Sequence, residues 1–189
     1  MPPATHLHRS GPNRLASVQN VARLLVCIAV LAAACATSAR SSADRPAPPL
    51  SPVVTPPNPV GEEIVVRTNA ERKMLGLPAL TRNIALMNAA QLQTNQMAAL
   101  TRMAHELPGA AYPSLDARLD AVGYRMRASG ENVAEGYPSG AAVVAGWMTS
   151  PGHRANIVST HFTEMGAGVA MAKNGRRFYA QVFGSPRWS

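Results

Sequence analysis

Apolar side chains recur at helical spacing in two long stretches of this chain. In residues 62–75 the expected inner face consists of Ile64, Val65, Thr68 and Met74, and a glycine and a proline just beyond are a stop signal. In residues 83–103 one face of a 3.6-residue period holds Leu86, Ala89, Ala90, Met97 and Leu100. Two helices are therefore predicted, and the methionines there are expected to fill gaps in the core: Met87, Met97 and Met103.

Two shorter helices are predicted from their capping residues. Ser114 can cap a helix over residues 115–122, and Ser139 can cap another over residues 141–149, which a Pro-Gly pair ends. Between these two helices, residues 130–136 (GENVAEG) have a glycine at each end. Such bracketing predicts a loop.

The last part of the chain has the pattern of strands. Residues 165–172 are small and apolar, and further on Phe178, Ala180 and Val182 alternate with other residues. The Asn-Gly pair at 174–175 is a strong hairpin signal between them. Helices followed by an antiparallel hairpin predict an α+β fold, with helices packed on a small sheet.

The N-terminal part carries an export signal. Arg23 precedes an apolar run over residues 24–35, which is shorter than the ~20 residues needed to cross a bilayer. An uncleaved anchor is the alternative. Cleavage has two forms: Ala-Cys-Ala at 34–36 fits an ordinary signal peptidase, whereas residues 32–35 resemble a lipobox, with lipid on Cys35 and alanine where leucine is usual.

These features divide the chain into three parts. Residues 1–36 are expected to be the signal peptide, and residues 37–60, rich in Pro, Ser and Ala, an extended spacer. Residues 61–189 form the folded domain. Cys27 lies inside the apolar run and is lost with the signal, so the mature domain is expected to have no disulfide.

The formal net charge is +8, but the basic residues are scattered rather than gathered in a stripe with aromatic residues. Nucleic acid is therefore not an expected partner. A weak attraction to anionic lipid or wall polymer is compatible with this charge.

Three side chains could carry chemistry in the folded domain. His105 and His153 fall at the ends of predicted helices, and Glu131 lies in the predicted glycine-bracketed loop. Two imidazoles and a carboxylate are enough for a partial metal site or an acid/base pair. Their spacing matches no metal motif, so surface or capping roles stay open for each, and His161 is expected at the surface.

Several motifs follow one another in a definite order. They are Asn69-x-x-Arg72, Gly76-Leu77, Leu80, His105, Gly130-Glu131-Asn132, Trp147-Met148-x-Ser150-Pro151-Gly152-His153-Arg154-x-Asn156, Phe162, Gly166-x-Gly168 and Tyr179-x-Gln181-x-Phe183-Gly184. This order resembles the CAP family of cysteine-rich secretory, antigen and pathogenesis-related proteins, in its bacterial type without disulfides.

The resemblance implies a three-layer α/β/α sandwich whose cleft holds two histidines and two acidic residues. His105 and His153 match the histidines and Glu131 matches the first acid. The second acid would fall at Ser150, which puts a four-residue catalytic scheme in doubt. In some relatives the histidines bind zinc or another divalent ion, so His105 and His153 are candidate ligands.

Neighbouring motif residues are expected to support the cleft. Asn132 and Arg154 are expected to hold its loops by backbone hydrogen bonds, and Trp147 to lie in the core with a partner for its indole N–H. Ser150 has none of the sequence context of a nucleophilic serine.

Three functions follow from the resemblance. The favoured one is a non-enzymatic, monomeric module of the bacterial cell envelope, secreted or anchored to the outer face through lipid on Cys35, that binds a lipid or wall component. The alternative is a metal-assisted peptidase or wall hydrolase that uses Glu131 as general base with the two histidines. The third is an interaction protein whose cleft is vestigial.

Overall fold

The computed structural model describes residues 58–187. The predicted signal peptide, Cys35 and most of the predicted spacer lie outside the described residues. The elements, in chain order, are α1 (Pro59–Met74), β1 (Thr81–Arg82), α2 (Ile84–Leu100), α3 (Leu115–Ala121), β2 (Met126–Glu135), α4 (Gly140–Thr149), α5 (Pro151–Val158), β3 (Glu164–Met171) and β4 (Arg177–Pro186). Within the described range, no helix is long and apolar enough to cross a bilayer.

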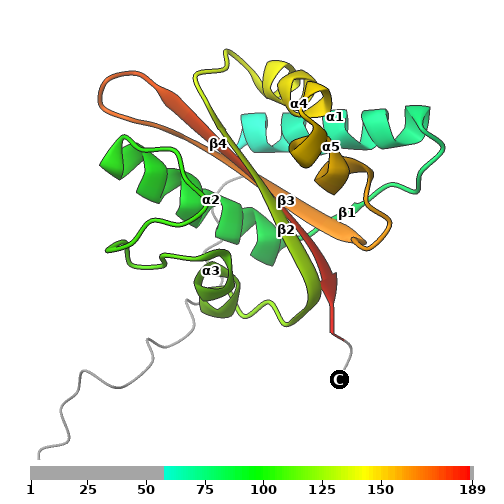
Figure 1. The fold of residues 1–189 in the computed structure, drawn as a ribbon, viewed down its shortest axis with the longest axis horizontal. Helices are drawn as coiled ribbons and strands as arrows, with labels where there is room; N and C mark the ends of the chain where they lie inside the picture. Colours follow the sequence, from blue (N-terminus) through cyan, green and yellow to red (C-terminus); the bar gives the residue numbers. More distant parts are fainter. Residues whose placement is uncertain (1–57, 188–189) are drawn as a thin grey trace, which may run out of the picture. The chain divides into compact units, whose positions relative to one another are not determined.

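The strands form one sheet in the order β1-β3-β4-β2 (Figure 1). The β3–β4 and β4–β2 pairs are antiparallel, and the short β1 adds a parallel pair at the β3 edge. The predicted hairpin is confirmed: Met171 pairs with Arg177 across a turn in which Gly175 has a φ of 80°. Such a turn requires a residue in the left-handed conformation, and glycine adopts that conformation readily.

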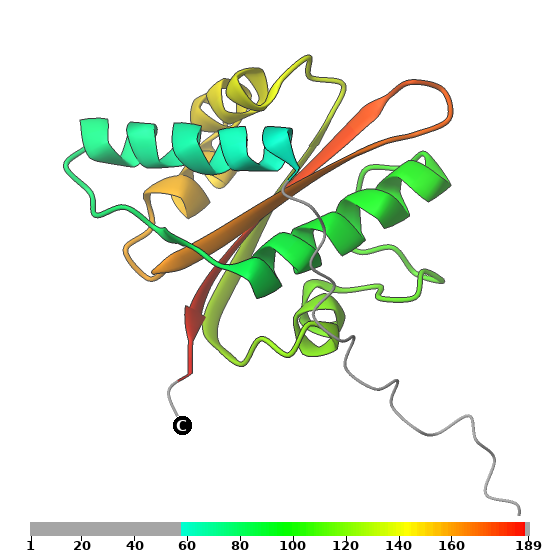
Figure 2. The ribbon, with the colours of Figure 1, turned by 180° about the vertical axis from the view of Figure 1, so that it is seen from behind.

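Helices cover both faces of the sheet, with α1, α4 and α5 on one side and α2 and α3 on the other (Figures 1 and 2). Side chains of β4 alternate between two apolar cores. Tyr179 and Phe183 belong to the core beneath α1, α4 and α5, whereas Phe178, Ala180 and Val182 belong to the core beneath α2 and α3. The predicted α+β class and three-layer sandwich are confirmed.

The capped helices lie close to their predicted positions. Asn83, Ser114 and Ser139 each occupy an N-cap and accept hydrogen bonds from backbone N–H groups of the first turn. These bonds satisfy donors that have no partner inside the helix. α2 ends at Leu100 rather than at residue 103, because Thr101 adopts a left-handed conformation with a φ of 49°.

Two residues placed in the apolar faces are in solvent. Leu100 is 53% exposed and Met74 is 71% exposed, so their assignment to the core was wrong. On α1 the buried position near the C-terminus belongs to Arg72. Its guanidinium donates to the carbonyls of Ile157 and Ser159, at 2.7 and 2.8 Å, and thereby ties α1 to the end of α5.

The segment predicted as a loop at 130–136 is the second half of β2. Glu131 pairs with Val182 and Asn132 with Gln181 in register, and Gly136, with a φ of 81°, follows the strand. The sequence did not indicate this strand because Glu131 and Asn132 are polar residues that are nevertheless buried. Their partners lie far away in the sequence.

A further helix, α5, was not predicted. Pro151 does end α4, but it also occupies the first turn of α5, where proline is well tolerated because its missing N–H would have no intrahelical partner. His153 therefore lies in the first turn of a helix and not in a loop.

The close approach of α2 to β3 explains the Gly166-x-Gly168 motif. A Cβ at Gly168 would lie 2.7 Å from the backbone nitrogen of Gln91, and one at Gly166 would overlap the backbone of Leu86 and Met87. Only glycine lets the helix backbone rest on the strand at this distance.

Replacement of Gly166 by alanine should therefore destabilise the domain by at least ~2 kcal/mol, because backbone atoms cannot move aside as a flexible side chain can. Urea unfolding measures the effect. Gly152→Ala is the matched control, since a Cβ there meets nothing within 4 Å. Equal stability of the two variants would contradict the packing described.

Candidate functional site

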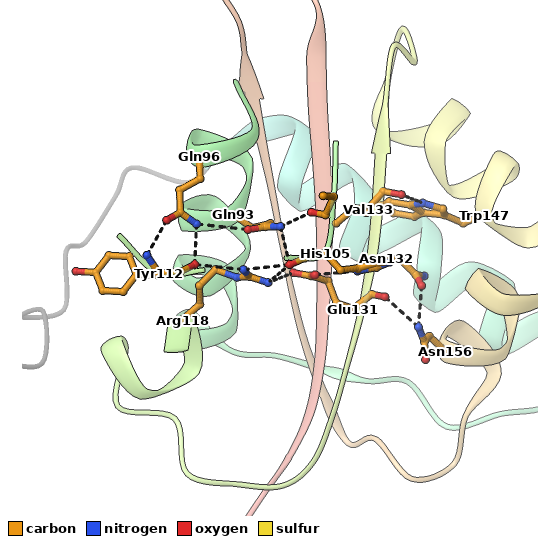
Figure 3. Close-up of polar contacts among 11 residues, drawn as sticks. Gln93, Gln96, His105, Tyr112, Arg118, Glu131, Asn132, Val133, Trp147 and Asn156 are labelled. Atoms are coloured by element: carbon orange, nitrogen blue, oxygen red, sulfur yellow. Dashed lines mark hydrogen bonds and ion pairs between the residues drawn. The ribbon is translucent and has the colours of Figure 1, made fainter. Parts of the chain in front are cut away.

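A buried ion pair forms the base of the site (Figure 3). Glu131 on β2 accepts from Arg118 on α3 through Oε2 at 2.7 Å, and its Oε1 lies 3.0 Å from Nδ1 of His105. The side chains of Arg118 and Glu131 are 0% and 3% exposed, whereas that of His105 is 56% exposed. The carboxylate thus links a fully buried cation to an imidazole at the surface.

The backbone carbonyl of His105 accepts hydrogen bonds from two buried side chains. Gln93, buried on α2, donates from Nε2 to the His105 carbonyl at 3.2 Å. Arg118 donates to the same carbonyl at 3.5 Å. Both ends of the histidine, ring and backbone, are therefore fixed by buried side chains.

His153 lies on α5, with its Nδ1 3.0 Å from the hydroxyl oxygen of Ser150. Ser150 is the residue where the family pattern has its second acid. The ring of His153 is tilted by 50° to that of Trp147, with centroids 6.5 Å apart. Trp147 is buried and donates from its indole nitrogen to the Val133 carbonyl at 3.3 Å.

Asn132 connects His153 to the sheet. It donates to the His153 carbonyl at 3.2 Å and accepts from Asn156 at 2.9 Å, while Asn156 also donates to the Glu131 carbonyl at 3.1 Å. Gly130 makes room for this arrangement, since a Cβ there would lie 2.8 Å from Phe162. The three residues of the Gly-Glu-Asn segment therefore have separate roles: Gly130 leaves room for Phe162, Glu131 binds Arg118 and His105, and Asn132 holds the His153 backbone.

The structure brings most of the expected residues together. His105 and Glu131 are in direct contact, and Asn132 reaches the backbone of His153. Arg154 is different: its side chain is exposed on α5, and its contact within residues 58–187 is made by the backbone N–H, which donates to the Ser150 carbonyl at 2.8 Å. The role expected of Arg154 is filled by Asn156.

Arg118 and Asn156 were not predicted from the sequence to be site residues. Asn156 belongs to the same motif as His153, and its spacing of three residues from that histidine was a usable signal. Arg118 lies in no motif and is preceded by polar and small residues, so nothing local marks it as buried.

An open pocket of about 240 Å³ adjoins His153. Its lining includes Met103, Ala134, Tyr137, Trp147 and His153. Met103 is 44% exposed, so it is not the core residue that the sequence predicted, whereas Met87 and Met97 are buried.

The two histidines differ in their electrostatic surroundings. The hydrogen bond to Glu131 raises the pKa of His105 above its ordinary value, against an opposing effect of burial. Burial lowers the pKa of His153, and the nearby His105 lowers it further. At pH values between the lowered pKa of His153 and the raised pKa of His105, the imidazole of His105 is cationic while that of His153 is neutral.

The donor set limits how a metal ion could be held. Nδ1 of each histidine is engaged, which leaves the two Nε2 atoms, and both oxygens of Glu131 are already in ion pairs. No group of three or more His, Cys, Asp or Glu side chains within residues 58–187 is placed to hold a metal. At most the two Nε2 atoms are left as ligands, which is fewer than the four that a structural zinc site usually has.

The described residues form an α/β/α domain that contains no cysteine. The sequence profile of the cysteine-rich secretory protein (CAP) family matches residues 65–183, and the chain belongs to that family.

Two curated proteins of Bacillus subtilis are similar to the chain. The uncharacterized protein YkwD is 34% identical over 107 residues, which are 57% of this chain and 41% of YkwD. The uncharacterized membrane protein YlbC is 38% identical over 77 residues, 41% of this chain and 20% of YlbC. The chain thus spans less than half the length of both relatives.

Solved structures share the fold. An extracellular SCP-domain protein of Bacillus anthracis has a TM-score of 0.60 at 28% identity, over 67% of this chain and 40% of that one. An outer surface protein of Borrelia burgdorferi has a TM-score of 0.61 at 19% identity, over 67% of this chain and 92% of its own.

The two histidines should titrate in a definite order, His105 above pH 6.5 and His153 below it, as followed by NMR. Because the folded-state pKa of His105 is raised, its bond to Glu131 contributes fully to stability below the unfolded value of about 6.5. That contribution is lost as pH rises through the raised pKa. The stability difference between wild type and His105→Ala should therefore shrink with rising pH, and the reverse order or trend would contradict the assigned pair.

Proposed function

We propose that this protein is an exported module of the bacterial cell envelope that binds a lipid or wall component and does not act as a hydrolase. The observation that carries the proposal is the state of Glu131. Both carboxylate oxygens are engaged, by Arg118 and by His105, and only 3% of the side chain is exposed. Glu131 organises the cleft.

A hydrolase would need a general base within reach of a water molecule or substrate. To act as one, Glu131 would have to leave a buried arginine unpaired, which is costly. At the position of the second acid, Ser150 contacts His153 instead. The metal-assisted hydrolase of the sequence analysis is therefore the weaker candidate.

Two features favour a place outside the cytoplasm. The similar structures include proteins named as extracellular or outer surface proteins. The apolar run after Arg23 has the form of an export signal. With residues 37–60 as a spacer, and lipid on Cys35 where the lipobox is used, the domain would act as a monomer held beyond the membrane.

The proposal is tested by capture. The mature chain is incubated separately with a total lipid extract and with wall fragments, and retained molecules are identified by mass spectrometry. His153→Ala should lower retention about fivefold, equivalent to ~1 kcal/mol for a lost contact. His161→Ala is the matched control, because His161 is exposed and outside the cleft.

A parallel assay separates binding from hydrolysis. Peptide and wall substrates are incubated with the protein, with and without Zn²⁺, beside Glu131→Gln. The expected result is no turnover that depends on Glu131. Turnover that Glu131→Gln abolishes, or the absence of any retained lipid or wall fragment, would overturn the proposal.

A further inference from the structure

Three exposed arginines lie at one end of the sheet, where β2 begins and β4 ends (Figures 1 and 2). Arg125 comes just before β2 and Arg187 just after β4, and the backbone N–H of Arg187 donates to the Arg125 carbonyl at 2.9 Å. Arg127 is the extra residue of a bulge in β2. We call these three residues the arginine cluster, since they occupy neighbouring positions on two adjacent chain segments.

No ion pair within residues 58–187 neutralises the arginine cluster. The acidic residue on the adjoining part of β3 is Glu164, and its carboxylate is engaged by neutral donors, Tyr124 at 2.6 Å and Asn83 at 3.2 Å. Asp120, the acidic residue nearest in sequence, is in none of those ion pairs. Three positive charges are therefore available to a partner.

The arrangement costs stability in the free protein. Arg125 and Arg187 lie next to each other on antiparallel segments, where like charges repel. A partner with several negative charges removes this repulsion and is attracted by all three cations at once. Charge complementarity thus favours a polyanion over a ligand with a single charge.

Protection of a sheet edge does not account for the whole arginine cluster. Charged side chains on an edge strand hinder pairing with another chain, and β2 is an edge strand. This reading explains Arg125 and Arg127. It does not explain Arg187, which follows β4, because β4 lies inside the sheet between β3 and β2.

The surroundings favour a hydrophilic partner over a bilayer. Binding to a membrane surface grows with the apolar area that enters it as well as with charge. Within residues 58–187 the exposed large apolar side chains lie on α1, on α2, just beyond these helices and at the end of β3: Val66, Met74, Leu75, Ile84, Leu100, Met103 and Met171. The arginine cluster therefore combines charge with no such apolar side chain from the segments that carry it.

We infer that the arginine cluster binds a hydrophilic anionic polymer, with phosphate or carboxylate groups repeated along its chain. A guanidinium suits both groups because it donates two parallel hydrogen bonds to either of them. Arg127 precedes Glu131 by four strand residues, about 13 Å, so this surface is separate from the candidate site. The inference thus goes beyond the proposed function and adds a second contact, which would hold the domain on a polymer while His153 stays accessible.

The test is binding of the mature chain to fluorescein-labelled polyphosphate at 0.15 M salt, followed by fluorescence anisotropy. Binding should weaken steeply as salt is raised, because each neutralised anionic group releases counterions. Unlabelled polyphosphate and polygalacturonate are compared as competitors, and the one that competes at lower concentration identifies the preferred anionic group. Dextran, a neutral polymer, should not compete.

Substitution of the arginine cluster locates the surface. Arg125→Gln, Arg127→Gln and Arg187→Gln, combined in one chain, should weaken polyphosphate binding at least about tenfold. The combination Arg125→Lys, Arg127→Lys and Arg187→Lys keeps the charge and should keep most of the affinity. Thermal unfolding checks that each variant is folded.

A matched control removes the same charge elsewhere. Arg67→Gln, Lys73→Gln and Lys173→Gln change exposed residues of α1 and of the β3–β4 turn. At 0.15 M salt, charges more than about 8 Å from the bound polymer are largely screened. The control should therefore change the affinity less than about twofold.

Equal losses in the glutamine variant and the control, or no binding of either polymer, would overturn the inference. Binding to vesicles of anionic lipid without binding to the polymers would also overturn it, in favour of a membrane. Self-association of the glutamine variant with unchanged polymer binding would assign the arginines to edge protection instead. His153→Ala should leave polyphosphate affinity unchanged, so failure here is distinct from failure of the capture experiment that tests the proposed function.

Discussion

The candidate site depends on one buried interaction, the ion pair between Arg118 and Glu131. Both side chains are almost entirely removed from water, so each charge would be costly without the other. The pair therefore needs α3 and β2 to stay together, and His105 is held by the oxygen that Arg118 leaves free. A long-range electrostatic contact thus sets the position of a side chain at the surface.

The position of His153 depends on Asn132, the next residue of the same strand. Successive side chains of a strand point to opposite faces of a sheet. Glu131 points to the side of α2 and α3, and Asn132 points to the side of α5, where it holds the His153 backbone and is itself linked to Gln181 at 3.4 Å. Two adjacent residues of β2 thus position the two histidines from opposite layers.

The parts of the fold with local signals could be predicted from the sequence. The caps at Ser114 and Ser139 and the Asn-Gly turn are set by neighbouring residues, and the structure has them where they were expected. The strand around Glu131 and the helix after Pro151 were missed because distant partners stabilise them. The order of the layers was predicted from the family resemblance. The burial of Arg118 could not be predicted, because it depends on the carboxylate of Glu131 on another element.

Glu131 is an acceptor that orients His105, so the tautomer of the neutral His105 imidazole tests this role most directly. A carboxylate oxygen can only accept, and His105 Nδ1 must therefore carry the proton. Long-range ¹H–¹⁵N NMR of the neutral protein above the His105 pKa distinguishes the two tautomers. The predicted result is the Nδ1–H form with a free Nε2, and the Nε2–H form would contradict the central role given to Glu131.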